Sequence, residues 1–194
     1  MSDEKLLKLL TELLAGGRQD NNISAISKLI RVSLDADLDC GGTMAVCKKL
    51  TNSTLLRDIK TFFDKRGNFK SDNSANLLRL LWRASHYDAG FCEKLIEEKV
   101  HEVIVSYFTS HKLSTEDDTF EACLNILHNV LQNYSESQTA LYNEKLLKVL
   151  TGLTSDENQF IRATSLLLYA YIVDLHAEDE KMSKSEVMTH NNCY

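Results

Sequence analysis

Cysteine and histidine are the side chains of this chain with the widest chemical scope. Cys123 and His128 lie five residues apart in one segment and have the residue types of a nucleophile and its base. On a helix, however, residues three or four apart face one another, so this spacing separates the thiol from the imidazole. Cys92 and Cys123 occupy positions patterned as core, where cysteine behaves as a small hydrophobe. We therefore predict that neither thiol is catalytic.

Metal and acid–base chemistry have equally little support. The five cysteines form an odd set without a CxxC pair, and Cys40 and Cys47 are too far apart for a metal clip. The carboxylates of Glu116-Asp117-Asp118 and Asp156-Glu157 precede long helical segments, where they favour the positive end of the helix dipole. No GxSxG, GxGxxG, P-loop or HExxH motif is present. We expect no enzyme activity, no metal and no cofactor, and a reducing compartment, the cytoplasm or alternatively the nucleus.

Polar and aromatic side chains recur at helical spacing in two segments. In the first they fall at i, i+3, i+4 and i+7, opposite an apolar face of leucines, and comprise Arg79, Trp82, Arg83 and His86. The spacing recurs in a second segment at Asn125, His128, Asn129 and Gln132. An ordinary solvated helix face is the simplest explanation. Two faces built without Asp or Glu are unexpected, however, in a chain of net charge −6, which favours a binding surface.

The elements that must position these stripes are helices. The chain has no proline and only 7 glycines, whereas strands need turn residues every 8–12 residues or so. Apolar residues recur at helical spacing almost throughout. The pattern predicts about eleven helices, over residues 6–14, 23–34, 43–50, 53–65, 71–85, 89–97, 99–110, 116–133, 135–143, 144–154 and 157–175.

The helices follow an internal repeat. The segment from Glu4 to Thr11 nearly duplicates the segment from Glu144 to Thr151. Equivalent positions at Leu6, Leu56, Val100 and Leu146 give spacings of 50, 44 and 46 residues. A period in the forties with short loops indicates stacked helical units of the armadillo or HEAT class.

The order of helices within a unit is short, medium and long. The segment from Cys123 to Val130 resembles the third-helix motif of armadillo repeats, Ala-Leu-x-Ala-Leu-x-Asn-Leu. The resemblance implies an all-α, right-handed α-solenoid of about four repeats over residues 1–175, followed by a disordered tail at 176–194. Glu98 and Asn143 stand where the family usually has glycine, and Arg83 stands where Asn129 lies one unit later. A HEAT-like solenoid is the alternative.

The resemblance also implies a function. Third helices of armadillo repeats line a concave groove, and an asparagine at the position of Asn129 holds the backbone of an extended peptide. This chain would then be a non-enzymatic scaffold for another protein, whose bound segment the arginines indicate to be acidic or phosphorylated. The expected groove residues are Arg31, Arg79, Trp82, Arg83, His86, Asn125, His128, Asn129, Gln132, Arg162 and Tyr169.

The C-terminal predicted helix suggests a second hypothesis. Its residues are apolar nearly all round, whereas a terminal solenoid unit normally presents a polar outer face. We therefore expect a second copy, the C-terminal tail or a partner domain to cover this end, with Tyr171 and Ile172 at the contact. The negative net charge weighs against a nucleic-acid partner. No apolar run approaches the roughly 20 residues that cross a membrane.

Overall fold

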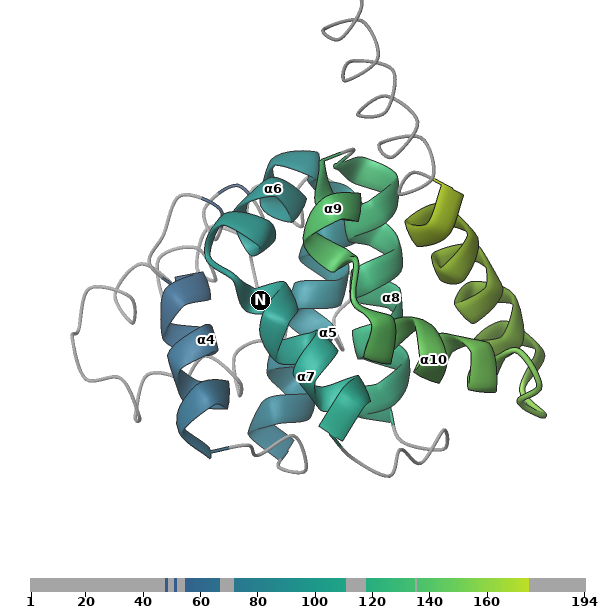
Figure 1. The fold of residues 1–194 in the computed structure, drawn as a ribbon. Helices are drawn as coiled ribbons and strands as arrows, with labels where there is room; N and C mark the ends of the chain where they lie inside the picture. The colour runs from purple at the N-terminus through teal and green to yellow at the C-terminus, as the bar shows by residue number, and fades with distance from the viewer. Residues whose placement is uncertain are drawn as a thin grey trace, which may run out of the picture.

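The computed structural model describes residues 48, 51, 55–66, 72–110, 118–134 and 136–174. Within these ranges all regular elements are helices, which confirms the predicted all-α class (Figure 1). The helices are α4 (Leu55–Arg66), α5 (Asp72–Tyr87), α6 (Ala89–Glu97), α7 (Val100–Ser110), α8 (Asp118–Asn133), α9 (Ser137–Leu141), α10 (Glu144–Leu153) and a final helix over residues 159–174.

The described part of the chain thus contains eight helices rather than eleven. Each of the eight matches a helix predicted from residue 53 onward, with ends that differ by a few residues. The three predicted helices between residues 6 and 50 lie outside the described residues, apart from Lys48. The predicted tail at 176–194 lies outside them as well.

Side chains cap helices α6 and α10 at their N-terminal ends. Asp88 precedes α6, and its Oδ1 accepts a hydrogen bond from the Gly90 backbone N–H at 3.0 Å. Asn143 precedes α10 and accepts from the backbone N–H groups of Lys145 and Leu146 at 3.0 and 3.1 Å. Both caps satisfy donors that the first helical turn leaves without a partner. The asparagine at 143, where the resemblance would place glycine, is therefore an N-cap in extended conformation.

Glu98 stands at the other position where armadillo repeats usually have glycine, and its role differs from that of Asn143. The turn between α6 and α7 contains Lys99 with a φ of 59°, a left-handed conformation that usually requires glycine. The sequence located this turn one residue early, at Glu98. Glu98 instead accepts hydrogen bonds from the Nε and Nη2 atoms of Arg57 at 3.1 Å. This ion pair links α4 to the α6–α7 turn.

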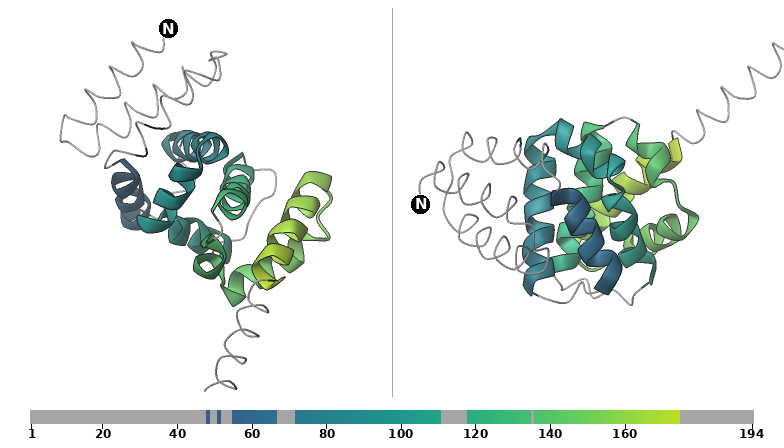
Figure 2. Two further views of the ribbon diagram at one scale, coloured as in Figure 1. Left: turned by 90° about the horizontal axis from the view of Figure 1, so that it is seen from above. Right: turned by 90° about the vertical axis from the view of Figure 1, so that its left-hand side faces the viewer.

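Helices three places apart in chain order pack against one another. Helix α4 contacts α7, and α7 contacts α10; α5 contacts α8, and α6 contacts α9. Figure 2 shows these helices arranged in successive layers, with the final helix at one end. Their lengths repeat as well: α6, α7 and α8 have 9, 11 and 16 residues, and α9 and α10 have 5 and 10 before the long final helix.

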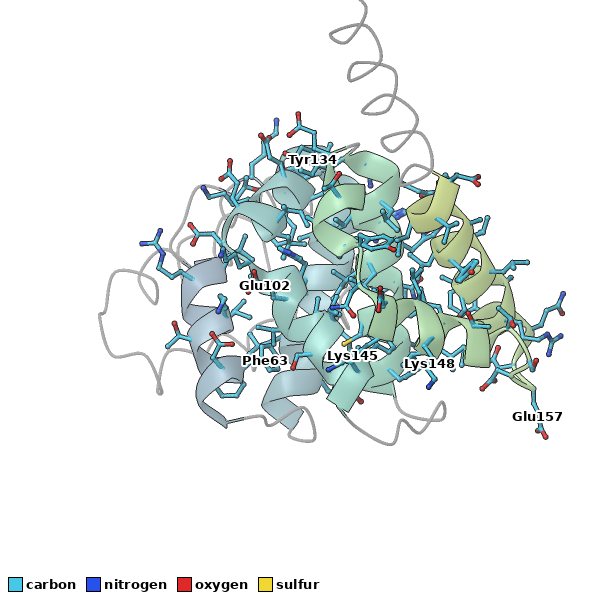
Figure 3. The ribbon with its side chains drawn as sticks, in the orientation of Figure 1. Phe63, Glu102, Tyr134, Lys145, Lys148 and Glu157 are labelled. Atoms are coloured by element: carbon cyan, nitrogen blue, oxygen red, sulfur yellow. The ribbon has the colours of Figure 1, made fainter. Side chains whose placement is uncertain are left out.

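One apolar core runs between the layers. Phe63 of α4 is buried and points toward α7 (Figure 3). Phe108 of α7 meets Phe120 of α8 edge to face, with ring centroids 5.2 Å apart. Helix α8 contacts α5, α6 and α9 and buries every residue from Ala122 to Leu127. The stripe predicted on α8 is therefore partly in the interior.

Substitution of Lys99 by glycine tests the strain in the α6–α7 turn. Relief of the left-handed conformation is worth about 1–2 kcal/mol, whereas the added freedom of the unfolded chain costs about 0.4–1 kcal/mol. We expect Lys99→Gly to raise the free energy of unfolding by up to about 1 kcal/mol in urea titrations. Asn143→Ala, which removes a cap in the next unit, should lower it by about 1 kcal/mol. A less stable Lys99→Gly variant would contradict this assignment.

Candidate binding surface on helices α5 and α8

Helices α5 and α8 form the most extensive helix pair of the described structure. Leu77, Leu78 and Leu81 of α5 are buried, as are Leu124 and Leu127 of α8. The apolar faces of the two helices belong to one core. The position of each stripe residue then depends on whether it points out from this pair or into the seam between the helices.

Asn129 lies in the seam. Its side chain is 5% exposed, and its Nδ2 donates to the Trp82 backbone oxygen at 3.3 Å and to Ser85 Oγ at 3.0 Å. Ser85 Oγ in turn donates to the Trp82 backbone oxygen at 2.7 Å. The expectation that Asn129 faces an open groove is therefore wrong. Side-by-side packing of α8 on α5 turns this position toward the neighbouring helix, where the amide joins the two helices.

Asn125 is also internal rather than exposed. It is 7% exposed, and its Nδ2 donates to the Glu121 backbone oxygen at 3.0 Å, one turn earlier in α8. Asn133, which the sequence analysis did not select, donates from Nδ2 to the Ser85 backbone oxygen at 3.2 Å. Its spacing of four residues from Asn129 is the signal that could have identified it. Asn129 and Asn133 together form an amide seam between α8 and the C-terminal half of α5.

The remaining stripe residues of α5 and α8 are all at least partly exposed. Arg83, His86 and Gln132 are exposed, whereas Arg79, Trp82 and His128 are half-buried. Trp82 also packs against the core. We call these six residues the polar patch: Arg79, Trp82, Arg83, His86, His128 and Gln132. Glu121 is exposed one turn before Asn125 and places a carboxylate on the same side of α8 as the predicted stripe. The predicted stripe did not include this carboxylate.

Burial disfavours the protonated form of two histidines, His128 and His101. Burial lowers the pKa of His128, and its hydrogen bond with the Asn129 side chain opposes the shift. Burial also lowers the pKa of His101 on α7, against a hydrogen bond with the Leu95 backbone. His101 is 7% exposed, and its Nδ1 has no hydrogen-bond partner. Protonation of either ring in the folded protein is unfavourable, because the charge would be only partly solvated.

The other predicted groove residues do not join the polar patch. Arg31 lies outside the described residues. Arg162 is half-buried, and its Nη1 donates to the backbone oxygens of Asp156 and Glu157 at 2.6 and 2.8 Å. The Arg162 guanidinium is therefore bonded to the loop that precedes the final helix. Tyr169 is partly buried and packs against the core.

The final helix divides the two predicted oligomer residues between its two sides. Ile172 is only 2% exposed and faces the core, so its assignment to an outer surface is wrong. Tyr171 is 41% exposed. Three further large apolar side chains on this helix are exposed, namely Phe160, Leu166 and Leu167. The outer side of the helix is thus apolar, at the positions next to those predicted.

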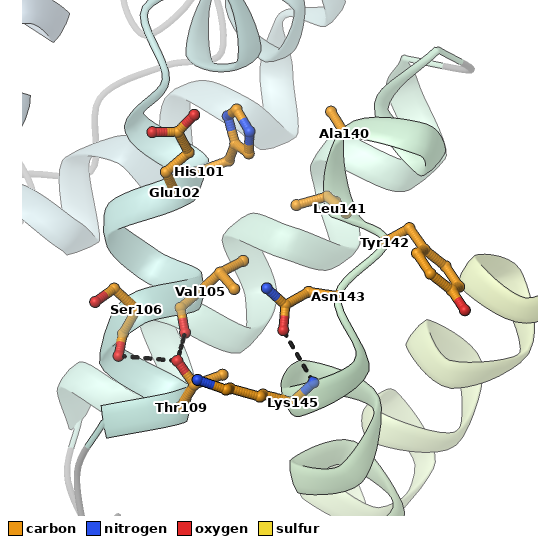
Figure 4. A pocket seen from close by; sticks show the side chains of 10 residues that line it. All are labelled: His101, Glu102, Val105, Ser106, Thr109, Ala140, Leu141, Tyr142, Asn143 and Lys145. Carbon is orange, nitrogen blue, oxygen red and sulfur yellow. Dashed lines mark hydrogen bonds between the residues drawn. The ribbon is translucent and has the colours of Figure 1, made fainter.

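A hollow of about 360 Å³ lies between α7 and the α9–α10 connection (Figure 4). Several of its polar groups form hydrogen bonds at the ends of helices. Asn143 turns its oxygen to the first turn of α10, and Thr109 Oγ donates to the Val105 backbone oxygen at 3.0 Å. His101 and Lys145 also line it. These residues form no pair of nucleophile and base, so we assign no chemistry to the hollow.

Reactive and metal-binding groups are not assembled in the described ranges. Cys92 is buried, and its Sγ donates to the Ser85 backbone oxygen at 3.2 Å. Burial raises the pKa of this thiol to about 12, which keeps it protonated and a poor nucleophile. No group of three histidine, cysteine or acidic residues that could hold a metal occurs among the residues that the structure describes.

Comparison with protein-family models, with curated proteins and with solved structures finds no match to this chain. The resemblance to armadillo repeats therefore stays a prediction that rests on the repeat pattern. Within the described ranges, no helix is both long enough and apolar enough to cross a membrane.

Substitution of Asn129 by alanine tests the amide seam. The change leaves the Trp82 carbonyl and Ser85 hydroxyl without their buried partner, which costs about 1–3 kcal/mol. We expect Asn129→Ala to lower the free energy of unfolding by this amount in urea titrations. Gln132→Ala, on the exposed side of the same helix, should change it by less than about 0.5 kcal/mol. Equal stabilities of the two variants would place Asn129 at the surface after all.

The two histidines with lowered pKa make stability depend on pH. In the unfolded chain they bind protons below about pH 6.5, whereas the folded protein resists this protonation. The unfolded state therefore binds more protons, and the free energy of unfolding should fall as the pH decreases from 7 to 5. His101→Gln should flatten this slope in urea titrations at several pH values. A slope unchanged by this substitution would show that His101 is protonated freely in the folded protein.

Proposed function

We propose that this chain is a non-enzymatic protein-interaction scaffold built from armadillo-like units. The support is the repeated order of a short, a medium and a long helix, together with the packing of each helix on the one three places later. That packing is what a solenoid of three-helix units requires. A HEAT-like unit, with two helices, leaves α6 and α9 without a role. We extend the proposal to a right-handed solenoid of about four units over residues 1–175.

The polar patch is the observation that carries the proposed binding role. It combines the single tryptophan of the chain, two arginines and two histidines on adjacent helices. Tryptophan and arginine dominate the energetics of protein interfaces, and arginine pairs in a bidentate manner with carboxylates and phosphates. An extended acidic or phosphorylated segment of another protein is the ligand that these groups favour. Glu121 marks the end of the patch where such a segment would be repelled.

The amide seam gives this proposal a rigid base. The Asn129 amide is engaged by Trp82, Ser85 and His128, so we assign it to the support of the patch and not to the peptide backbone. The bond to the Trp82 carbonyl fixes the backbone that carries the half-buried indole. A preorganised anchor loses less conformational entropy when it binds.

A binding experiment tests the patch. An array of acidic and phosphorylated peptides of about 15 residues should yield ligands that shift the fluorescence of Trp82. Arg83→Ala should weaken their binding by about 1–2 kcal/mol, and the difference should shrink at high salt because ions screen the arginine. Lys148→Ala, an exposed cation on α10, is the matched control and should bind normally. Equal affinities of Arg83→Ala and the wild type would place the contact elsewhere.

A second function is favoured by the final helix. Four large apolar side chains there are 41–59% exposed, whereas a terminal repeat normally has a polar outer face. The corresponding proposal is an assembly module whose C-terminal end packs on another protein surface. The two functions are compatible, because the polar patch and the final helix occupy different parts of the chain.

A further inference from the structure

The hollow between α7 and the α9–α10 connection lies where two consecutive repeats meet. The repeat pattern makes Leu56, Val100 and Leu146 equivalent, and they stand near the starts of α4, α7 and α10. Helix α4 contacts α7, and α7 contacts α10. Each position at the first of these two contacts can therefore be compared with the position at the same offset in the second.

An ion pair bridges the first contact. Arg57, one residue after Leu56, donates from Nε and Nη2 to the two carboxylate oxygens of Glu98 at 3.1 Å. Glu98 stands two residues before Val100. Paired hydrogen bonds between a guanidinium and a carboxylate are among the stronger polar contacts of proteins. The Arg57 side chain thus spans the space between α4 and the turn that precedes α7.

This bridge is missing at the second contact, between α7 and α10. The residues at the same offsets are His101 and Glu144, and in the described structure no ion pair or hydrogen bond joins them. An imidazole cannot make the two parallel bonds of a guanidinium. The hollow lies here instead, lined by His101 and Glu102 of α7 and by Asn143 and Lys145 on either side of Glu144 (Figure 4).

His101 contributes an unused acceptor to the wall of the hollow. The residue is 7% exposed, and its Nδ1 has no hydrogen-bond partner. The hydrogen bond of the ring with the Leu95 backbone therefore runs through Nε2, which donates to the carbonyl. In a neutral imidazole whose Nε2 donates, Nδ1 is an acceptor. A buried acceptor without a partner costs free energy, and a donor that enters the hollow removes this cost.

The charged groups around the hollow leave the Glu144 carboxylate without a counter-ion. Lys99 Nζ lies 3.7 Å from Glu102 Oε1, so these two charges largely offset one another. Lys145 lines the hollow but extends toward the C-terminal end of α7 (Figure 4). Glu144 is exposed in the first turn of α10 and has no ion pair within the described ranges. A cation from outside supplies the charge that the arginine supplies at the first contact.

We propose that the hollow receives an arginine side chain of a bound protein segment, in the place that Arg57 fills one repeat earlier. The guanidinium pairs with the Glu144 carboxylate and donates to His101 Nδ1. Its five donors in a fixed fork suit two acceptors that come from neighbouring helices. The volume of about 360 Å³ is at the lower end of the range of ligand pockets, which suits one long side chain. This site is separate from the polar patch and takes a ligand of opposite charge.

Peptide binding followed by NMR of the full chain tests the proposal. The capped peptide acetyl-Gly-Arg-Gly-amide should shift the backbone signals of His101, Asn143 and Lys145 in a saturable manner. The matching citrulline peptide has the same shape without the charge and should bind about tenfold more weakly. Equal binding of the two peptides, or unshifted signals at about 20 mM arginine peptide, would overturn the proposal. Binding of free arginine without binding of the capped peptide would overturn its assignment to a protein segment.

Two substitutions locate the site. Glu144→Gln removes the proposed carboxylate and should weaken binding of the arginine peptide about fivefold or more. Glu93→Gln removes the same charge at an exposed position of α6 and should bind as the wild type does. His101→Arg restores the arginine of the first contact, so it should fill the hollow and abolish binding of the peptide.

The outcome with Glu144→Gln decides the proposal even where His101→Arg does not fold. Normal binding of the arginine peptide by Glu144→Gln would overturn it, because the carboxylate would then have no part in the contact. Binding of acidic peptides at the polar patch should be the same in Glu144→Gln and in the wild type. Failure of this site is therefore distinguishable from failure of the proposed function.

Discussion

The structure depends most on one buried polar contact, the amide of Asn129 between α8 and α5. Its Nδ2 reaches the Trp82 carbonyl and the Ser85 hydroxyl across the most extensive helix pair of the described chain. A buried amide is costly unless its hydrogen bonds are made, so this contact permits one register of the two helices. That register sets which residues of α5 and α8 reach the surface. The composition of the polar patch therefore follows from the register of α5 and α8.

The two proposed interaction surfaces differ in their physical basis. The polar patch shares helices α5 and α8 with the amide seam, and it would select a ligand by charge and by its tryptophan. The outer side of the final helix has apolar side chains that the fold leaves exposed, and it would associate through the hydrophobic effect. Salt should therefore weaken binding at the first surface and strengthen it at the second. This opposite response makes the two roles separable in one protein.

Groups with reactive side chains serve the packing in the described structure. The Cys92 thiol is held protonated by burial and donates to the carbonyl of Ser85, which belongs to the same seam. Burial disfavours the protonated forms of His101 and His128. Burial of these two histidines thereby makes the free energy of unfolding depend on pH. This use of titratable groups agrees with the proposed role as a scaffold, for which rigid packing matters more than reactivity.

The sequence by itself determined the helices, because a spacing of three to four residues between apolar side chains is a local property that survives in any packing. It also located the turn at Glu98, although the left-handed residue is Lys99. Only the tertiary structure decided which polar residues are outside. Asn125, Asn129 and Arg83 lie on the same stripes in sequence, yet the asparagines are buried and the arginine is exposed. The approach of α8 to α5 decides between them, since a stripe at the edge of an apolar face can point to water or to a neighbouring helix. The exposure of Tyr171 and the burial of Ile172 have the same physical origin.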